Sequence, residues 1–169
     1  MRQKIYYPRV LDLSDLVCDR SCFLFGPRQS GKSSFLQRQL HEKPVLYVDL
    51  LDRAEFGVFF EHFVFLELRA FLDYFEPRSE IGLWRTQKGE FEVDFVVGRR
   101  LGIEVKAAGR VTPRHLDGLR KLREEGIVAK LVVVSCEPHC RHLEEENIRI
   151  YPWRNFISEL WSRRGWLWE

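Results

Sequence analysis

A glycine-rich loop near the N-terminus constrains the fold of this chain more than any other part of its sequence. Residues 26–33 read GPRQSGKS and match G-x-x-x-x-G-K-[ST] at every fixed position. The apolar run at 22–25 favours a strand before the loop, and residues 34–40 favour a helix after it. In this context, N–H groups at the helix start bind phosphates, Lys32 reaches the terminal ones and Ser33 holds Mg²⁺. The candidate binding residues for ATP and Mg²⁺ are Gly26, Pro27, Arg28, Gln29, Ser30, Gly31, Lys32, Ser33 and Ser34.

The loop belongs to a fragment that is too short to form a stable sheet by itself. A second strand is expected at 45–48, which makes residues 22–48 a β-α-β unit. Two strands cannot form a parallel sheet with both faces covered. We therefore expect this unit to use a neighbouring part, to form a homo-oligomer or to stay loose. No later apolar strand ends in the pair of acids that holds the metal in such ATPases, so ATP hydrolysis is expected to be impaired or absent.

The residues after position 52 predict a second unit with its own core. The chain of 169 residues is 45% hydrophobic and has thirteen Phe and five Trp, a composition that excludes a mostly disordered protein. Hydrophobic spacing and turn residues predict an α/β domain. The expected elements are a helix at 56–72, strands at 81–86, 91–97 and 101–107, a helix at 112–126, strands at 130–135 and 147–151, and a helix at 152–161. We place the domains at 1–52 and 53–169.

Two of these strands have ionisable residues among apolar ones. On the strand at 91–97, alternation predicts that Asp94 lies on the face opposite the apolar residues Phe91, Val93, Phe95 and Val97. On the next strand, Glu104 and Lys106 share one face because side chains repeat every two residues. If the two strands are neighbours, Asp94, Glu104 and Lys106 are expected to lie close together.

These residues predict a divalent-metal site. Asp94 and Glu104 offer carboxylate oxygens, which Mg²⁺ prefers as ligands. Lys106 would orient an attacking water or stabilise the charge that develops on a phosphate. Glu61, on the preceding helix, would complete the metal shell or position Lys106, and Glu67 on the same helix is the second choice. The candidate catalytic residues are therefore Glu61, Asp94, Glu104 and Lys106, with Asp94 and Glu104 as metal ligands. A purely structural cluster of ion pairs is the alternative.

Charge indicates a partner less clearly than the motifs do. The formal net charge is +2, which favours no class of partner. Between residues 99 and 130, however, nine Lys or Arg stand against four acids, for a local charge of +5. A nucleic-acid face and an ordinary solvated helix surface both fit this pattern, and the second is the more frequent.

The N-terminus and the lack of a membrane-spanning stretch predict a cytoplasmic protein with reduced thiols, and the cysteines raise the question of a zinc site. The two C-x₃-C pairs are Cys18 with Cys22 and Cys136 with Cys140, and zinc tolerates such spacing. Cys22 and Cys136 nevertheless lie in or beside apolar runs, so we interpret both as small core residues. No stretch has the length of a membrane-spanning helix, and residues 1–8 lack the apolar core of a signal peptide.

Several segments of the sequence resemble known families. The order of helix, strands and acids after residue 53 resembles the PD-(D/E)xK nuclease-like fold. The segments at 57–68, 84–85, 89–95 and 103–106 look like DUF4143, the C-terminal domain of a prokaryotic family of AAA-type ATPases. Residues 26–33 are similar to the start of the ATPase domain of the same family, and residues 151–153 are similar to its ending.

The resemblance implies an α/β protein with a P-loop β-α-β remnant followed by a nuclease-like α-β-β-β-α-β domain. Family members are longer, and the middle of the ATPase domain, with the Walker B acids, the arginine finger and the linking helical region, is missing between about residues 52 and 55. The adenine pocket of the family and most of its supporting sheet are expected to be absent as well. The chain therefore looks like an internally deleted member, and the ATP hydrolysis of the family does not transfer to it. Three functions stay open: ATP binding, Mg²⁺-dependent nuclease activity, and non-catalytic interaction with a protein or nucleic acid. The sequence therefore leaves open whether the chain is an enzyme.

Overall fold

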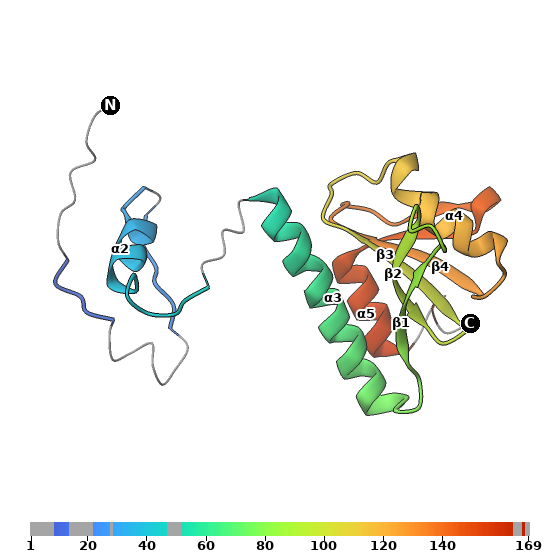
Figure 1. Cartoon of the computed structure of the whole chain (residues 1–169), viewed down its shortest axis with the longest axis horizontal. Helices are drawn as coiled ribbons and strands as arrows, with labels where there is room; N and C mark the ends of the chain where they lie inside the picture. Colours follow the sequence, from blue (N-terminus) through green and yellow to red (C-terminus); the bar gives the residue numbers. More distant parts are fainter. Residues whose placement is uncertain (1–8, 14–21, 28, 47–51, 164–166, 168–169) are drawn as a thin grey trace. The chain divides into compact units, whose positions relative to one another are not determined.

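The computed structural model describes residues 9–13, 22–27, 29–46, 52–163 and 167. The chain divides into two compact units, Met1–Val48 and Asp49–Glu169. Each unit is described by itself (Figure 1). Among the described residues, no helix has both the length and the apolar character needed to cross a membrane.

The first unit contains the helix α2 (Lys32–Gln39), which begins directly after the glycine-rich loop. The strand predicted at 22–25 does not form, and the side chains of Phe23 and Phe25 are 85% and 86% exposed. Val45 and Leu46, at the start of the second predicted strand, are likewise exposed and outside any strand, and residues 47–48 lie outside the described part. A strand needs a neighbour to pair its backbone N–H and C=O groups, and the described part of this unit offers none.

The second unit is a six-stranded mixed sheet with helices on both faces, so the predicted α/β class is confirmed at this level. The strand order is β1-β2-β3-β4-β6-β5. Neighbours β1, β2 and β3 are antiparallel, β3, β4 and β6 are parallel, and β5 is antiparallel to β6. The strands are β1 (Ile81–Arg85), β2 (Glu92–Val97), β3 (Leu101–Lys106), β4 (Lys130–Ser135), β5 (Arg141–Leu143) and β6 (Ile148–Pro152). The helices are α3 (Arg53–Phe75), α4 (Asp117–Glu124) and α5 (Trp153–Ser162), with short 3₁₀ turns at Pro113–Leu116 and Glu144–Glu146.

The long helix α3 covers one face of the sheet together with α5 (Figure 1). It begins at Asp52, whose carboxylate accepts hydrogen bonds from the N–H groups of Ala54 at 2.8 Å and Glu55 at 3.2 Å. Its buried residues recur at helical spacing: Phe60, Val64, Leu68, Phe71 and Leu72. The predicted helix is therefore confirmed, but only one stripe of it is buried, since other apolar positions such as Leu66 are exposed.

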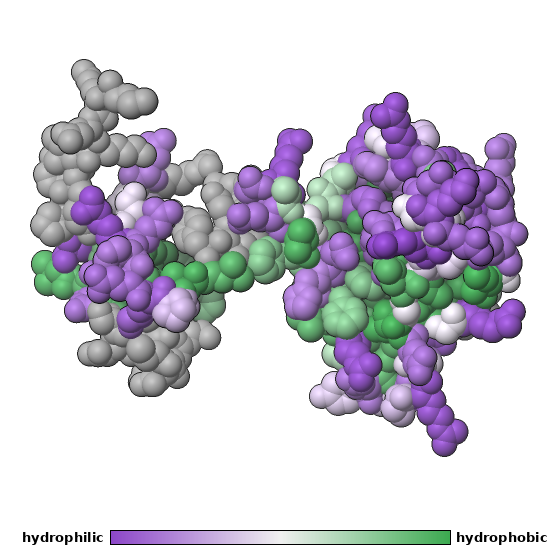
Figure 2. Space-filling view, viewed as in Figure 1, coloured by the Kyte–Doolittle hydropathy of each residue, from purple (hydrophilic) through white to green (hydrophobic). Residues whose placement is uncertain are grey.

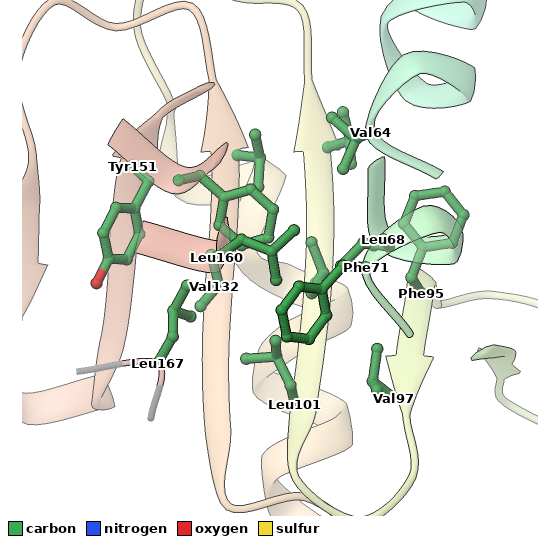
Figure 3. Close-up of a cluster of buried hydrophobic side chains, with 14 of the residues drawn as sticks. Val64, Leu68, Phe71, Phe95, Val97, Leu101, Val132, Tyr151, Leu160 and Leu167 are labelled. Carbon is green, nitrogen blue, oxygen red and sulfur yellow. The ribbon is translucent and has the colours of Figure 1, made fainter. Parts of the chain in front are cut away.

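Two hydrophobic clusters hold the sheet between its helices. The first packs α3 and α5 against the sheet, and Figure 3 shows Leu68 and Phe71 next to Leu101 and Val97. The second packs Leu119 and Leu122 of α4 against the opposite face. The helix lies so close to β3 that a Cβ at Gly102 would be 2.7 Å from a methyl group of Leu122. The sheet is thus covered on both faces, as its parallel strands require.

A bulge in β2 changes the predicted faces. Gly82 pairs with Val96, but Trp84 pairs with Val93, so β2 has one more residue than β1 over this stretch. As a result, Val93 packs in the cluster under α4, while Phe95 packs in the cluster under α3. The prediction that Val93 and Phe95 share one face is therefore wrong, because an extra residue interrupts the two-residue repeat. The bulge contains Asp94.

Candidate functional site

The β2 bulge positions the first candidate acid between two strands. The pairing of β2 with β3 is described from Val97–Leu101 to Phe95–Ile103. Beyond that point the N–H group of Val105 donates to Oδ2 of Asp94 at 2.7 Å. A side-chain carboxylate thus accepts the hydrogen bond that a strand neighbour would otherwise take, which fixes the Asp94 carboxylate at the end of the ladder.

Lys106 joins the Asp94 carboxylate to that of Glu104. Its Nζ lies 2.5 Å from Oε1 of Glu104 and 3.8 Å from Oδ2 of Asp94. The ammonium group is half-buried and the two carboxyl groups are largely buried. Glu104 and Lys106 are two residues apart on β3, so both side chains leave the same face of the strand. The structure thus brings Asp94, Glu104 and Lys106 together.

Glu104 is the most perturbed acid of this group. Burial, together with repulsion from Asp94, raises the pKa of Glu104 to about 7, although Lys106 acts in the opposite direction. Its Oε2 atom is buried and has no hydrogen-bond partner among the described residues. Burial also raises the pKa of Asp94. Burial alone would lower the pKa of Lys106, but the Glu104 carboxylate raises it, so the lysine stays charged.

The two helix acids behave differently from each other. Glu61 is exposed on α3, and no hydrogen bond or ion pair joins it to another described residue. Desolvation and then the Asp94 charge raise the pKa of Glu61, while Lys106 lowers it, so Glu61 is electrostatically linked to the cluster without contacting it. Oε2 of Glu67 accepts a hydrogen bond from Nε1 of Trp161 at 2.7 Å, which ties Glu67 to helix packing instead.

This cluster has part of what a divalent cation needs. Mg²⁺ is usually held by one or two carboxylates and keeps several waters. Asp94 and Glu104 are of that donor type, and Oε2 of Glu104 has no hydrogen-bond partner among the described residues. The described residues contain no group of three or more His, Cys, Asp or Glu that could hold a metal. Any cation would therefore depend on these two carboxylates and on water.

The glycine-rich loop forms a second candidate site, in the first unit. Nζ of Lys32 donates to the carbonyl oxygens of Gly26 at 2.8 Å and Pro27 at 2.6 Å, and lies 3.3 Å from Oγ of Ser30. Gly31 precedes α2 with φ of 79°, a left-handed conformation that favours glycine, and no side chain caps the helix start. The N–H groups of the first turn are therefore available to an anion.

The other predicted loop residues lie around this core. Ser33 and Ser34 are exposed in the first turn of α2, and Gln29 has a positive φ of 60°. Arg28 lies outside the described residues. Beside the loop is a cavity of about 390 Å³, which falls in the size range of small-molecule sites. It is lined by Arg9, Val10, Leu11, Leu24, Phe25, Gly26, Pro27, Ser30, Gly31, Lys32 and Phe35.

Sequence reasoning missed Arg9 as a neighbour of the loop. Its Nη2 donates to the carbonyl oxygen of Ser30 at 2.6 Å, across 21 positions of the chain. No spacing rule in the sequence links residues so far apart. Only the path of the chain places it there.

One domain of the chain has a family assignment. The family described as Domain of unknown function (DUF4143) matches residues 56–156. The chain belongs to this family. No curated protein and no solved structure matches it. The match extends from α3 into α5, so the DUF4143 domain contains Glu61, Asp94, Glu104 and Lys106, whereas the glycine-rich loop precedes it.

The basic residues Arg120 and Lys121 of α4 form ion pairs within the DUF4143 domain. Arg120 pairs with Glu146 at 2.8 Å and with Asp117 at 2.9 Å, and Lys121 pairs with Glu124 at 2.8 Å. Asp117 and Glu124 are among the four acids already counted in the local charge of +5, so of these pairings only the one with Glu146 offsets charge beyond that count.

The cysteines offer no metal site in the described residues. Cys22 and Cys140 are exposed and Cys136 is half-buried, while Cys18 lies outside the described part. The prediction that Cys22 is a core residue is wrong, because the strand that would have buried it does not form. Burial raises the pKa of Cys136, which disfavours the thiolate that metal binding needs.

Proposed function

We propose that this chain is an ATP-binding protein of the AAA/DUF4143 type that hydrolyses ATP poorly or not at all. The phosphates would lie against residues 26–34, with Lys32 at the terminal phosphates and Ser33 on Mg²⁺. The observation that carries the proposal is the position of Lys32, whose ammonium group lies over the loop and contacts the carbonyls of Gly26 and Pro27. A cation held there compensates phosphate charge at the uncapped start of a helix.

The expected lack of hydrolysis follows from the composition of the cavity. Its described lining has two cationic residues, Arg9 and Lys32, and no Asp or Glu. Catalysis of phosphoryl transfer needs an acid that holds the metal and a group that orients the attacking water. This site therefore favours binding over turnover.

A direct binding measurement tests the proposal. We expect a fluorescent ATP analogue to bind the full chain in the presence of Mg²⁺. Lys32→Ala should weaken that binding at least about tenfold, because it removes the cation that faces the phosphates. Lys43→Ala is the matched control, since Lys43 lies in the same unit but does not line the cavity. Absence of binding by the wild-type chain at millimolar ATP would refute the proposal.

A second function is supported by a separate observation, the unpartnered Oε2 of Glu104 beside Asp94. We propose that the DUF4143 domain is a Mg²⁺-dependent nuclease of the PD-(D/E)xK class. A bound Mg²⁺ would supply Lewis-acid activation of a phosphodiester. Asp94 and Glu104 would hold it, Lys106 would stabilise negative charge, and Glu61 would help to position Lys106 from α3.

Cleavage of supercoiled plasmid in Mg²⁺ tests this second function. We expect Asp94→Asn and Glu104→Gln each to abolish nicking, because each removes an anionic ligand. Asp73→Asn is the control, since Asp73 is exposed on α3 and pairs with Arg69. Nicking that survives in Asp94→Asn would exclude this site. A chain that neither binds ATP nor cleaves plasmid would leave the third function, a non-catalytic interaction with a protein or nucleic acid.

A further inference from the structure

The cavity beside the glycine-rich loop has walls from two separate segments. One wall is residues 9–11 and the other consists of residues between 24 and 35. Residues between 24 and 35 contribute the Lys32 ammonium group, loop residues and apolar side chains such as Phe25, while residues 9–11 contribute one arginine and two apolar residues. The lining thus combines two cations with apolar side chains. Ligand pockets commonly combine an apolar lining with a few placed polar groups.

Arg9 rests directly against the loop. Its Nη2 donates to the Ser30 carbonyl oxygen at 2.6 Å, and the same atom would lie 3.8 Å from a Cβ placed at Gly31. That bond uses one of the five N–H donors of a guanidinium group. A guanidinium group binds phosphate oxygens through two parallel hydrogen bonds, in a geometry that a lysine cannot reproduce. Because Arg9 and Lys32 both line the cavity, two cations are available to one ligand.

The apolar part of the cavity is unusually uncovered. Val10 is fully exposed, and Phe25 is 86% exposed although it lines the same cavity. Leu11 is 47% exposed, while Phe35, which also lines the cavity, is buried. Planar aromatic groups stack well on such surfaces, and burying apolar area from water is favourable.

We propose that this cavity is a nucleoside-polyphosphate site in which Arg9 binds phosphate together with Lys32, and in which Val10, Leu11 and Phe25 receive the base. The inference rests on the proposed ATP binding at the loop and names the residues that complete it. The residues that receive the base and the second cation, Arg9, all lie outside the glycine-rich motif. A bare polyphosphate would leave the base-binding residues unused, so the ligand is a nucleoside di- or triphosphate.

Competition and mutagenesis on the full chain test the inference. We expect Arg9→Ala to weaken binding of a fluorescent ATP analogue about tenfold, and Arg9→Lys to weaken it less, because the charge stays while the fork is lost. Inorganic tripolyphosphate should compete at least about tenfold more weakly than ATP, since it has no base to bury. Arg38→Ala, on α2 but outside the cavity lining, is the matched control and should bind as the wild type does.

The outcomes separate this inference from the function on which it rests. If the wild-type chain binds ATP and Arg9→Ala binds equally well, the role of Arg9 is overturned while ATP binding stands. If tripolyphosphate competes as well as ATP, the base-binding wall is overturned. If the wild-type chain does not bind ATP, both proposals fail. Far-ultraviolet circular dichroism of Arg9→Lys and Arg9→Ala shows whether a lost signal reflects lost structure instead.

Discussion

At the scale of single residues, the candidate acid site depends on Glu104, whose burial disfavours the charged carboxylate while Lys106 favours it. The Glu104 side chain is buried on a face that also packs apolar residues of α4, and one of its oxygens has no partner. The Lys106 ammonium group offsets part of the cost of that burial. Residues held in such unfavourable surroundings concentrate at functional sites, because the strain that they introduce is rarely kept for stability alone.

The burial of Glu104 predicts how the free energy of unfolding depends on pH in metal-free buffer. The folded-state pKa of Glu104 is raised from 4.5 to about 7, so the folded chain binds more protons than the unfolded chain between these values. The contribution of Glu104 to stability is therefore present below pH 4.5 and is lost as the pH rises to about 7. Glu104→Gln removes this loss, so its free energy of unfolding relative to the wild type should rise over that window by on the order of 1–3 kcal/mol.

Urea denaturation of both proteins at several pH values measures the difference. A difference that stays constant from pH 4.5 to pH 8 would show that Glu104 is not held in the surroundings described here. The same series in Mg²⁺ is informative, because a cation bound by the carboxylates would favour the charged form and shrink the difference.

At the scale of elements, regular repeats were predictable and their interruptions were not. The helix α3 and the strands β1 to β4 form close to their predicted positions, since each rests on a repeat that any sequence window contains. The bulge in β2 was not predictable, because Phe91, Val93, Phe95 and Val97 alternate without a break in the sequence. The same bulge directs Asp94 toward β3, so the proximity of Asp94, Glu104 and Lys106 could be predicted, but the hydrogen bond from Val105 to Asp94 could not. The run at 22–25 looks like a strand and fails to form one for lack of a partner.

The close approach of α4 to β2 predicts a sensitive glycine. A Cβ at Gly118 would overlap the backbone carbonyl oxygen of Glu92 and lie 3.1 Å from the carbonyl carbon. We expect Gly118→Ala to destabilise the chain by about 1–3 kcal/mol, because the helix must move off the sheet. Gly57→Ala in α3 is the matched control, since a Cβ there meets nothing within 4 Å. That control should be neutral or stabilising by up to about 1 kcal/mol, because alanine is the better helix former.

Thermal unfolding followed by circular dichroism ranks the two variants. Equal midpoints for Gly118→Ala and Gly57→Ala would show that the contact between α4 and Glu92 is looser than described.

At the scale of the whole molecule, the two units differ in how much core they contain. Figure 2 shows hydrophobic residues at the surface of both units. In the described part of the first unit, Leu13 and Phe35 are the buried hydrophobic residues, while Phe23, Phe25, Val45 and Leu46 are exposed. The second unit has two hydrophobic clusters on either side of a complete sheet. Stability increases with the apolar area removed from water, so among the described residues most of the hydrophobic stabilisation lies in the second unit.

This imbalance predicts that the two units respond differently when separated. A chain of residues 52–169 keeps the Asp52 cap, the sheet and both clusters, so it should unfold cooperatively at about the same temperature as the full chain. A chain of residues 1–51 should show no cooperative unfolding by itself, because its described core is too small to offset the entropy of ordering. Added ATP should order the 1–51 chain only if the loop binds nucleotide. Ordered structure that increases with protein concentration would show that copies of this unit cover each other's apolar residues.

Calorimetry of both chains measures these differences. An unfolding temperature of the 52–169 chain far below that of the full chain would mean that the first unit contributes to the core.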